Sequence, residues 1–281
     1  MNATEFELLG ELENEFEQEA MELEPLFYRR GASAQSFGMS EWGALELGAG
    51  LPGLPIPGTI HRFDCPAGCP ATLTAAQCRG AVRQAIRVAI DLATNAANKL
   101  EIPTKLQPSM RDPTKDGDAI QTAGFFRSFF GHDPSMPISY AGNEASGVSV
   151  AKRFRAVARE LGGGRRIVFR CLPARADCAD TDLTCCDATS RAWSRFNENV
   201  VRLCPPFWNL PEASRGGTIL HEMLHVLFNF LEDTGRRANA HCYKAFALRV
   251  RGYGRDLDAT CACWDLPPNN ECRRRIGLPP I

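Results

Sequence analysis

Two histidines and a glutamate within residues 218–228 have the types and spacing of a metal-dependent hydrolytic site. The stretch reads Thr-Ile-Leu-His-Glu-Met-Leu-His-Val-Leu-Phe, so His221 and His225 are four residues apart and Glu222 follows the first. On an α-helix, residues four apart lie one turn above each other, which directs both imidazoles to one point. Two nitrogen donors suit a tetrahedral Zn²⁺, and Glu222 could take a proton from water beside the metal. We therefore predict one catalytic Zn²⁺ bound by His221 and His225, with Glu222 as general base.

A catalytic zinc ion needs a third protein ligand and an open position for water. The acceptors that follow the motif are Glu232, Asp233 and His241. If the helix runs on through Asp233, that residue lies about 12 Å along the axis from His225, out of reach. If the helix ends at Asn229, Asp233 can turn inward. Because His241 is sixteen residues after His225, a hairpin could bring a second helix, near 239–250, back to the metal. We predict His241 as the third ligand, with Asp233 as the alternative.

The residues around the motif must form a buried helix for this site to exist. The apolar flanking residues have helical spacing: Ile219, Leu220, Met223, Leu224, Leu227 and Phe228. Pro211 and Gly216-Gly217 precede them. The structural alternative is a core helix with two hydrogen-bonded histidines and no ion. No Gly follows His225 closely, which excludes the metzincin peptidases, whose motif has Gly and a third His soon after.

The rest of the pattern predicts several helices and a small sheet that precedes the motif. Apolar spacing predicts helices over 71–100, closed by Pro103, over 122–130, and over 148–161, stopped by Gly162-Gly163-Gly164. Strand-like runs cover 166–171 and 199–204. The predicted fold class is therefore α+β and mostly helical. An edge strand of such a sheet could pair with an extended peptide and hold it across the metal.

The first 60 residues differ in composition from the remainder. Residues 5–24 hold nine Glu and no Lys or Arg, and residues 31–60 are rich in Gly, Ala, Ser and Pro. We predict an acidic mobile head over 1–30, a Gly/Pro-rich linker over 31–60 and one zinc metallopeptidase domain over 61–281. The head is interpreted as a solvated tail, an address for an export machine, or an acidic cover over the domain. The remaining basic excess is too diffuse to indicate a nucleic-acid partner.

The cysteine content indicates an oxidising compartment. The chain has 12 Cys, an even number, and no Cys-x-x-Cys, which favours disulfides over a thiolate metal site. The first 27 residues lack the basic start and apolar core of a secretory leader, and no stretch is long enough to span a bilayer. We predict secretion by a non-standard route and no membrane partner. A cytoplasmic location with reduced thiols is the alternative.

An ordered set of segments over roughly 65–250 resembles the deuterolysin and lysine-specific metalloendopeptidase family, the aspzincins. The segments are Cys78, Phe129-Phe130-Gly131, Val148 with Arg153-Phe154, Val168-Phe169-Arg170-Cys171, Leu203-Cys204-Pro205-Pro206-Phe207-Trp208, His221 to His225, and Asn239-Ala240-His241-Cys242-Tyr243-Lys244-Ala245-Phe246. The resemblance implies a mostly helical, zincin-like metallopeptidase domain with one Zn²⁺. It also implies endopeptidase activity and a secreted, disulfide-bonded protein.

The chain departs from this family after the motif helix. Family members carry Gly-Thr-x-Asp-x-x-Tyr-Gly there, and its Asp is the third ligand; this chain has no such motif. Where the family usually has Asn-Ala-Asp, this chain has Asn239-Ala240-His241. A shortened loop with ligation transferred to His241 accounts for both facts, and loss of metal binding is the competing hypothesis. The carbonyl-polarising Tyr is unassigned, because Tyr243 lies about 200° around a helix from His241 and should point away.

These observations together predict a zinc-dependent endopeptidase that acts on a polypeptide substrate. Glu222 takes a proton from water and passes it to the leaving amine. The alternative is a degenerate, non-catalytic zincin that acts as a disulfide-stabilised binding protein.

Overall fold

The computed structural model describes residues 60–65, 68–137, 146–175, 184–187, 189–233, 239–254, 256–264 and 270–275. The chain divides into two units, Met1–Leu51 and Pro52–Ile281, and every described residue belongs to the second. The acidic head predicted over 1–30 lies outside the described residues, as does the linker over 31–60 except for Ile60. The described part is α+β and mostly helical with one small mixed sheet, which confirms the predicted fold class at this level.

Four short strands form the sheet in the order β1-β2-β4-β3. They are β1 (Arg62–Asp64), β2 (Val168–Cys171), β3 (Ala192–Ser194) and β4 (Val200–Leu203). The first two pairings are parallel, and β3 runs antiparallel to β4. The runs predicted over 166–171 and 199–204 correspond to β2 and β4. Three-residue strands such as β1 and β3 are too short to show an alternating pattern, and the sequence did not indicate them.

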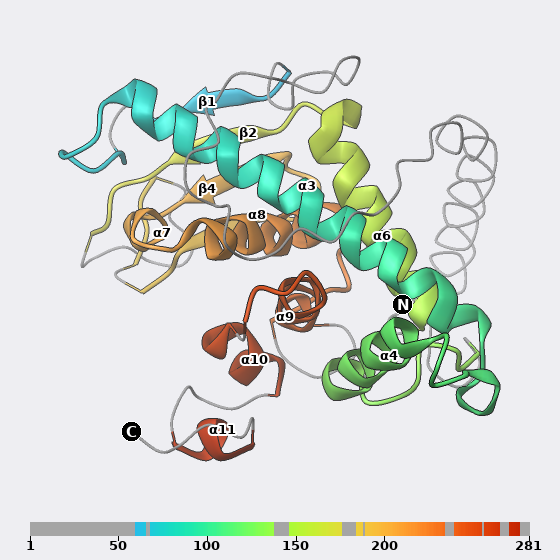
Figure 1. Ribbon diagram of the computed structural model, residues 1–281. Coiled ribbons are helices and arrows are strands. Elements are labelled where there is room, and N and C mark those ends of the chain that lie inside the picture. The colour runs from blue at the N-terminus through green and yellow to red at the C-terminus, as the bar shows by residue number, and fades with distance from the viewer. Residues whose placement is uncertain are drawn as a thin grey trace, which may run out of the picture. The chain divides into compact units, whose positions relative to one another are not determined.

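The longest helix, α3 (Ala75–Lys105), runs along α6 (Gly147–Arg159) and α8 (Glu212–Leu227), the helix with the His-Glu-x-x-His motif (Figure 1). Its start is fixed by a capping box, in which Thr74 Oγ1 accepts from the Gln77 N–H and the Gln77 side chain accepts from the Thr74 N–H.

The predicted bounds of this helix, 71–100 closed by Pro103, are wrong at both ends. The Thr74 cap delays the start, and the helix continues through Pro103 to Lys105. A proline so close to a helix end removes one hydrogen bond of the final turns, but the Leu106 N–H still donates to the Ile102 carbonyl at 3.1 Å. Pro103 therefore lies inside the last turn.

Seven further helical elements accompany α3, α6 and α8 within the described residues. They are η1 (Pro108–Met110), α4 (Gly117–Phe130), the π-turn η2 (Glu160–Gly164), α7 (Pro205–Trp208), α9 (Ala240–Val250), α10 (Leu257–Cys263) and α11 (Asn270–Arg275). The predicted helices over 122–130, 148–161 and 239–250 correspond to α4, α6 and α9. The glycine run ends α6 as predicted, with Gly163 at φ 133°.

Helix α8 is packed closely on two sides because it carries two adjacent glycines. A Cβ atom on Gly216 would overlap Val88 of α3, and one on Gly217 would lie 3.1 Å from Lys244 Cε of α9. Protein interiors are close-packed, so larger side chains here would push the helices apart. The glycine pair thus fixes the motif helix between α3 and α9.

An aromatic cluster holds α9 against α4 and α6. Phe126, Phe130, Phe154, Tyr243 and Phe246 are fully buried or nearly so, with ring centroids 4.5–6.1 Å apart. Tyr243 therefore lies in the core, as the helical angle predicted, and α9 is fixed in rotation about its axis.

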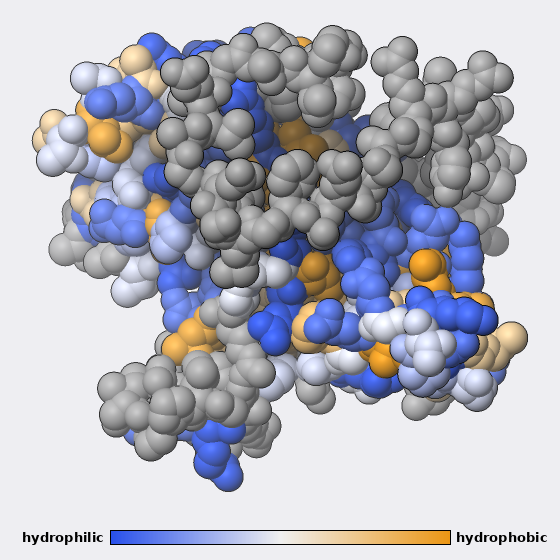
Figure 2. Space-filling view, in the orientation of Figure 1, coloured by the Kyte–Doolittle hydropathy of each residue, from blue (hydrophilic) through white to orange (hydrophobic). Residues whose placement is uncertain are grey.

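Disulfides join several of these elements. The pairs are Cys65–Cys171, Cys69–Cys78, Cys186–Cys204, Cys242–Cys263 and Cys261–Cys272. None of the described cysteines is free, which confirms the predicted disulfide bonding. Within the described residues, no helix combines the length and the apolar character needed to cross a bilayer. On the face in Figure 2, hydrophobic residues of the described part form small separate patches among hydrophilic ones.

Candidate metal centre

The motif helix presents its two histidines and its glutamate from one buried turn. His221 and Glu222 are 7% and 4% exposed, and His225 is partly buried near the end of α8. The helix ends at Leu227, where the Phe228 N–H donates to the Leu224 carbonyl at 2.9 Å and Phe228 becomes extended. This early end meets the condition under which Asp233 can turn inward.

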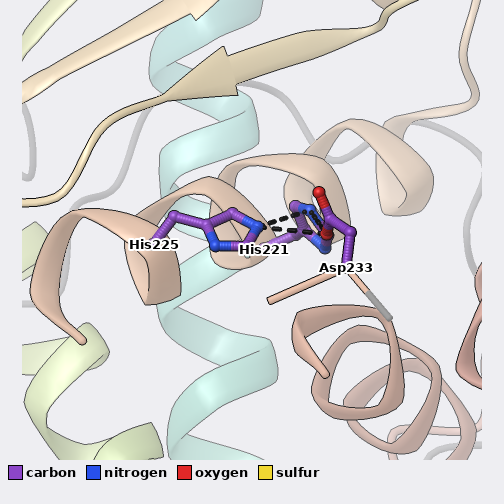
Figure 3. A group of neighbouring side chains, drawn as sticks. All are labelled: His221, His225 and Asp233. Atoms are coloured by element: carbon purple, nitrogen blue, oxygen red, sulfur yellow. Dashed lines mark hydrogen bonds and ion pairs between the residues drawn. The ribbon is translucent and has the colours of Figure 1, made fainter. Parts of the chain in front are cut away.

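Asp233 approaches both histidines (Figure 3). Its Oδ1 lies 3.0 Å from His221 Nε2 and 3.1 Å from His225 Nε2, and the two Nε2 atoms are 3.1 Å apart. Ligand atoms about 2.0–2.1 Å from a tetrahedral zinc ion are separated from one another by roughly 3.3–3.4 Å. The three atoms thus form a nearly equilateral triangle within a few tenths of an ångström of that spacing.

The hydrogen-bond partners explain why a cation fits this triangle. His225 Nδ1 lies 3.0 Å from the Leu231 carbonyl, which can only accept, so a neutral His225 carries its proton on Nδ1. Its Nε2 lone pair then faces His221 and Asp233, which is the orientation of a metal-binding histidine held by an outer partner. One proton can satisfy only one side of the triangle, whereas a cation at its centre satisfies all three atoms.

Contacts within the donor set shift the pKa values of Asp233 and His225. Burial alone would raise the pKa of Asp233, but hydrogen bonds from His221 and His225 outweigh it and hold the pKa well below its usual range. Burial would lower the pKa of His225, and Asp233 reverses that and raises it. A carboxylate that stays ionised between two imidazoles is a suitable ligand for a hard or borderline divalent ion.

His241, the predicted third ligand, lies beside the triangle on the first turn of α9. Its Nε2 is 3.4 Å from Asp233 Oδ1, and its ring centroid is 4.4 Å from that of His221. It falls outside the set of donor atoms that all lie within 4.8 Å of one another, which comprises His221, His225 and Asp233. Burial and the neighbouring His221 lower the pKa of His241 to about 3, so its ring is neutral at pH 7. The structure favours Asp233 as the third donor, and ligation by His241 stays a prediction.

Glu222 contacts the edge strand β3 and lines the same cavity as the donor triangle. Ser194 Oγ on β3 lies 3.0 Å from Glu222 Oε2 and 2.9 Å from the Glu222 carbonyl oxygen, so the hydroxyl donates to one of them. Burial raises the pKa of Glu222, and the potential of His221 and His225 opposes that shift. A carboxyl group with a raised pKa beside a metal site suits a group that accepts and returns a proton.

These groups line one cavity of about 560 Å³. Its walls come from β3, α8, the segment after α8 and the starts of α9 and α10; they include Ser194, Phe196, Phe228, Lys244 and Asp258. The aromatic rings lie beside the segment after α8, and the charged side chains lie toward α10. A cavity of this size, open to solvent and edged by a strand, can admit an extended polypeptide segment.

Three features of the site were missed from the sequence: Ser194, the Leu231 carbonyl and Lys244. Lys244 is buried, and its Nζ lies 3.2 Å from Asp256 Oδ2, which ties α9 to α10. Burial lowers the pKa of Lys244 despite this carboxylate. Its position one turn after His241 on a predicted helix was the only available signal. Ser194 and the Leu231 carbonyl lie in segments that no pattern marked.

Comparison of the chain with known protein families and with curated protein sequences found no match. The resemblance to aspzincins therefore stays a prediction from the ordered residues of the sequence.

Proposed function

We propose that the protein is a zinc-dependent endopeptidase in which His221, His225 and Asp233 hold the metal and Glu222 is the general base. The observation that carries the proposal is the triangle of donor atoms 3.0–3.1 Å apart, in a cavity that also contains the Glu222 carboxyl group. When bound, Zn²⁺ would polarise the scissile carbonyl group and acidify water. Three protein donors leave a fourth position open, as in catalytic zinc sites.

The chain's own residues would divide the remaining work. Glu222 accepts the proton of the attacking water and returns it to the leaving nitrogen. The Ser194 hydroxyl, 3.0 Å from Glu222 Oε2, orients the carboxyl group toward the cavity. Within the described residues, β3 has one strand neighbour, so its other edge is available to an extended substrate backbone. Side chains of that substrate would meet Phe196 and Phe228.

The Glu222→Gln variant tests this assignment. The amide keeps the size of the side chain but cannot take a proton, so peptide cleavage should fall by about 10²–10⁴-fold while bound zinc stays near one per chain. The measurement is cleavage of an unfolded protein substrate together with zinc content by mass spectrometry. His221→Ala is the matched control, because it should lose both zinc and cleavage. Wild-type-like cleavage by Glu222→Gln would refute the assignment.

One observation favours the second candidate, a non-catalytic zincin that binds a partner. His241 Nε2 lies 3.4 Å from Asp233 Oδ1, so a small shift would make it a fourth protein donor. Four protein ligands close a zinc site and leave no position for water. The visible spectrum of the Co²⁺-substituted protein separates the two: addition of a small anion changes the spectrum of an open site and leaves a closed one unchanged. His241→Ala should leave zinc binding largely intact if the site is open.

The disulfides support a place of action outside reducing compartments. An export machine that reads the acidic residues 1–30 as an address is the partner proposed for that secretion. Thiol alkylation of the protein from its native source, without added reductant, should label none of the described cysteines. Labelling at Cys242 or Cys261 would instead favour the cytoplasm.

A further inference from the structure

Asn239, directly before α9, connects the metal centre to two other segments. Its side chain is fully buried, and its Oδ1 accepts from the His241 N–H at 2.8 Å as the N-cap of α9. Its Nδ2 lies 3.3 Å from the Asp233 carbonyl oxygen and 3.2 Å from the Ala262 carbonyl oxygen. We propose that Asn239 is a positioning residue that holds Asp233 in ligating position. The inference rests on the proposed function, because it assigns a role toward the metal.

Capping alone does not explain an asparagine here. An N-cap needs an acceptor, which Ser, Thr or Asp would supply equally well. Asn additionally carries two N–H donors and no charge, and at this position both donors meet carbonyl groups of other segments. Full burial would disfavour a charged Asp. The amide therefore serves three partners that none of the other capping residues can serve together.

Asp233 needs such a restraint because it follows the end of the motif helix. Its side chain is 57% exposed, so packing does not fix it. The Ala240 N–H donates to the Glu232 carbonyl at 2.9 Å, which brings the backbone preceding Asp233 to the start of α9. The Asn239 amide then adds a bond at Asp233 itself. An outer partner of this kind commonly changes metal affinity without touching the ion.

The experiment compares the Zn²⁺ affinity of the full chain and its variants by competition with a chromophoric chelator. Asn239→Asp keeps the cap but replaces both N–H donors with a carboxylate oxygen. Its added negative charge would by itself favour a cation, so weaker binding reports the lost donors. Asn239→Ser keeps a shorter cap and adds no charge. We expect both to bind Zn²⁺ about 10–100-fold more weakly than wild type.

Ser146→Ala is the matched control, because Ser146 is a buried N-cap on α6 that accepts from the Ser149 N–H at 3.2 Å. It should bind Zn²⁺ as wild type does. In an Asp233→Ala background, Asn239→Ser should cause less than about a twofold further loss, because coupled residues are not additive. Unfolding curves in chelator show whether each apo variant is folded.

The outcomes separate the two claims. A wild-type protein that binds no Zn²⁺ refutes the proposed function. A wild type that binds and Asn239 variants that bind equally well overturn the positioning role alone. Failure of both variants to fold without metal also overturns it, because the amide would then be needed for the fold itself.

Discussion

Two aspartates of this molecule, the buried Asp133 and the more than half exposed Asp233, have pKa values below the usual range for different reasons. Asp133 is surrounded by groups that always carry protons: Arg111 donates at 2.6 and 2.8 Å, Arg127 at 2.9 Å and the Ser135 hydroxyl at 2.7 Å. Asp233 is surrounded by imidazole nitrogens that carry lone pairs as readily as protons. The Asp133 carboxylate therefore meets only obligatory donors, whereas the Asp233 carboxylate meets groups that can also share a cation with it.

The two clusters also differ in what their remaining nitrogen atoms contact. The second guanidinium nitrogen of Arg111 also donates to the Pro103 and Leu106 carbonyl groups, so this cluster closes the end of α3. At the other cluster, the Nδ1 atoms of His221 and His241 are buried and have no hydrogen-bond partner among the described residues. Arg111 Nε of the Asp133 cluster also has none, so the two clusters differ in the groups that face the carboxylate and not in the number of unsatisfied nitrogens.

The largest expected effect is that of Asp133→Asn on stability. It leaves two guanidinium groups, one of them buried, without their carboxylate, so the free energy of unfolding should fall by about 3–5 kcal/mol. Zn²⁺ affinity should stay at the wild-type value, since the cluster is not part of the donor set. Urea unfolding in chelator and a zinc titration measure the two quantities. If this substitution weakened Zn²⁺ binding by a similar free energy, the Asp133 cluster could not be separated from the donor triangle.

The corresponding substitution in the other cluster, Asp233→Asn, should change the stability of the apo protein little and weaken Zn²⁺ binding strongly. The side chain is more than half exposed, so the apo protein should change in stability by no more than about 0.5 kcal/mol. The stabilisation by saturating zinc should fall by about 2.7 kcal/mol, which corresponds to roughly 100-fold weaker binding. Thermal unfolding with and without zinc gives both values. If His241 is the essential donor instead, this substitution leaves the zinc effect intact and His241→Ala removes it.

The dependence of stability on acid pH should report the Asp133 cluster. Burial would raise the pKa of Asp133, but the hydrogen bonds from Arg111 and Ser135 outweigh it and hold the pKa at about 2. Because the folded-state pKa lies below the unfolded value, the carboxylate stabilises the fold fully above pH of about 4. That contribution, roughly 2 kcal/mol, is lost as the pH falls to about 2. Unfolding in chelator at pH 7, 4 and 2.5 should show this loss in wild type and its absence in Asp133→Asn.

The smallest change in stability is expected from removing the Ser194 hydroxyl, which is a hydrogen-bond donor to Glu222. Ser194→Ala removes the donor to Glu222 and should cost about 1 kcal/mol of stability, with zinc affinity unchanged and peptide cleavage reduced. Ser135→Ala is the control, because it removes one of several donors to Asp133 and should leave cleavage as it was. Equal effects of the two on cleavage would mean that Ser194 does not act through Glu222.

The helices of the site could be predicted because their spacing is periodic over many residues. The apolar pattern placed the motif on one buried helix and α9 within a residue of its observed start. Resemblance and pattern together also indicated the mostly helical α+β class. The segment between these helices could not be predicted, because no Gly or Pro marks the end of α8. The residues just after that end make tertiary contacts: Arg153 of α6 lies 5.8 Å from the Phe228 ring centroid and 4.6 Å from that of Phe230.

The position of Asp233 illustrates this limit. The sequence indicated His241 and Asp233 as candidates for the third donor. The choice between them depends on the residue at which α8 ends. Contacts with a distant helix, such as those of Arg153 with Phe228 and Phe230, leave no local pattern in the sequence. Ser194 was invisible for a related reason, since three residues of β3 form a strand only because β4 is there to pair with it.

The glycine pair of α8 has a consequence for how the cavity can change shape. Val88 of α3 and Lys244 of α9 lie close against these glycines, so a shift of the motif helix toward either neighbour would bring it into their side chains. We therefore expect changes in the width of the cavity at its other boundaries, which are the edge strand β3 and the segment after Leu227. Substitutions in these two boundaries should therefore alter substrate selectivity, while the motif helix between them keeps its position.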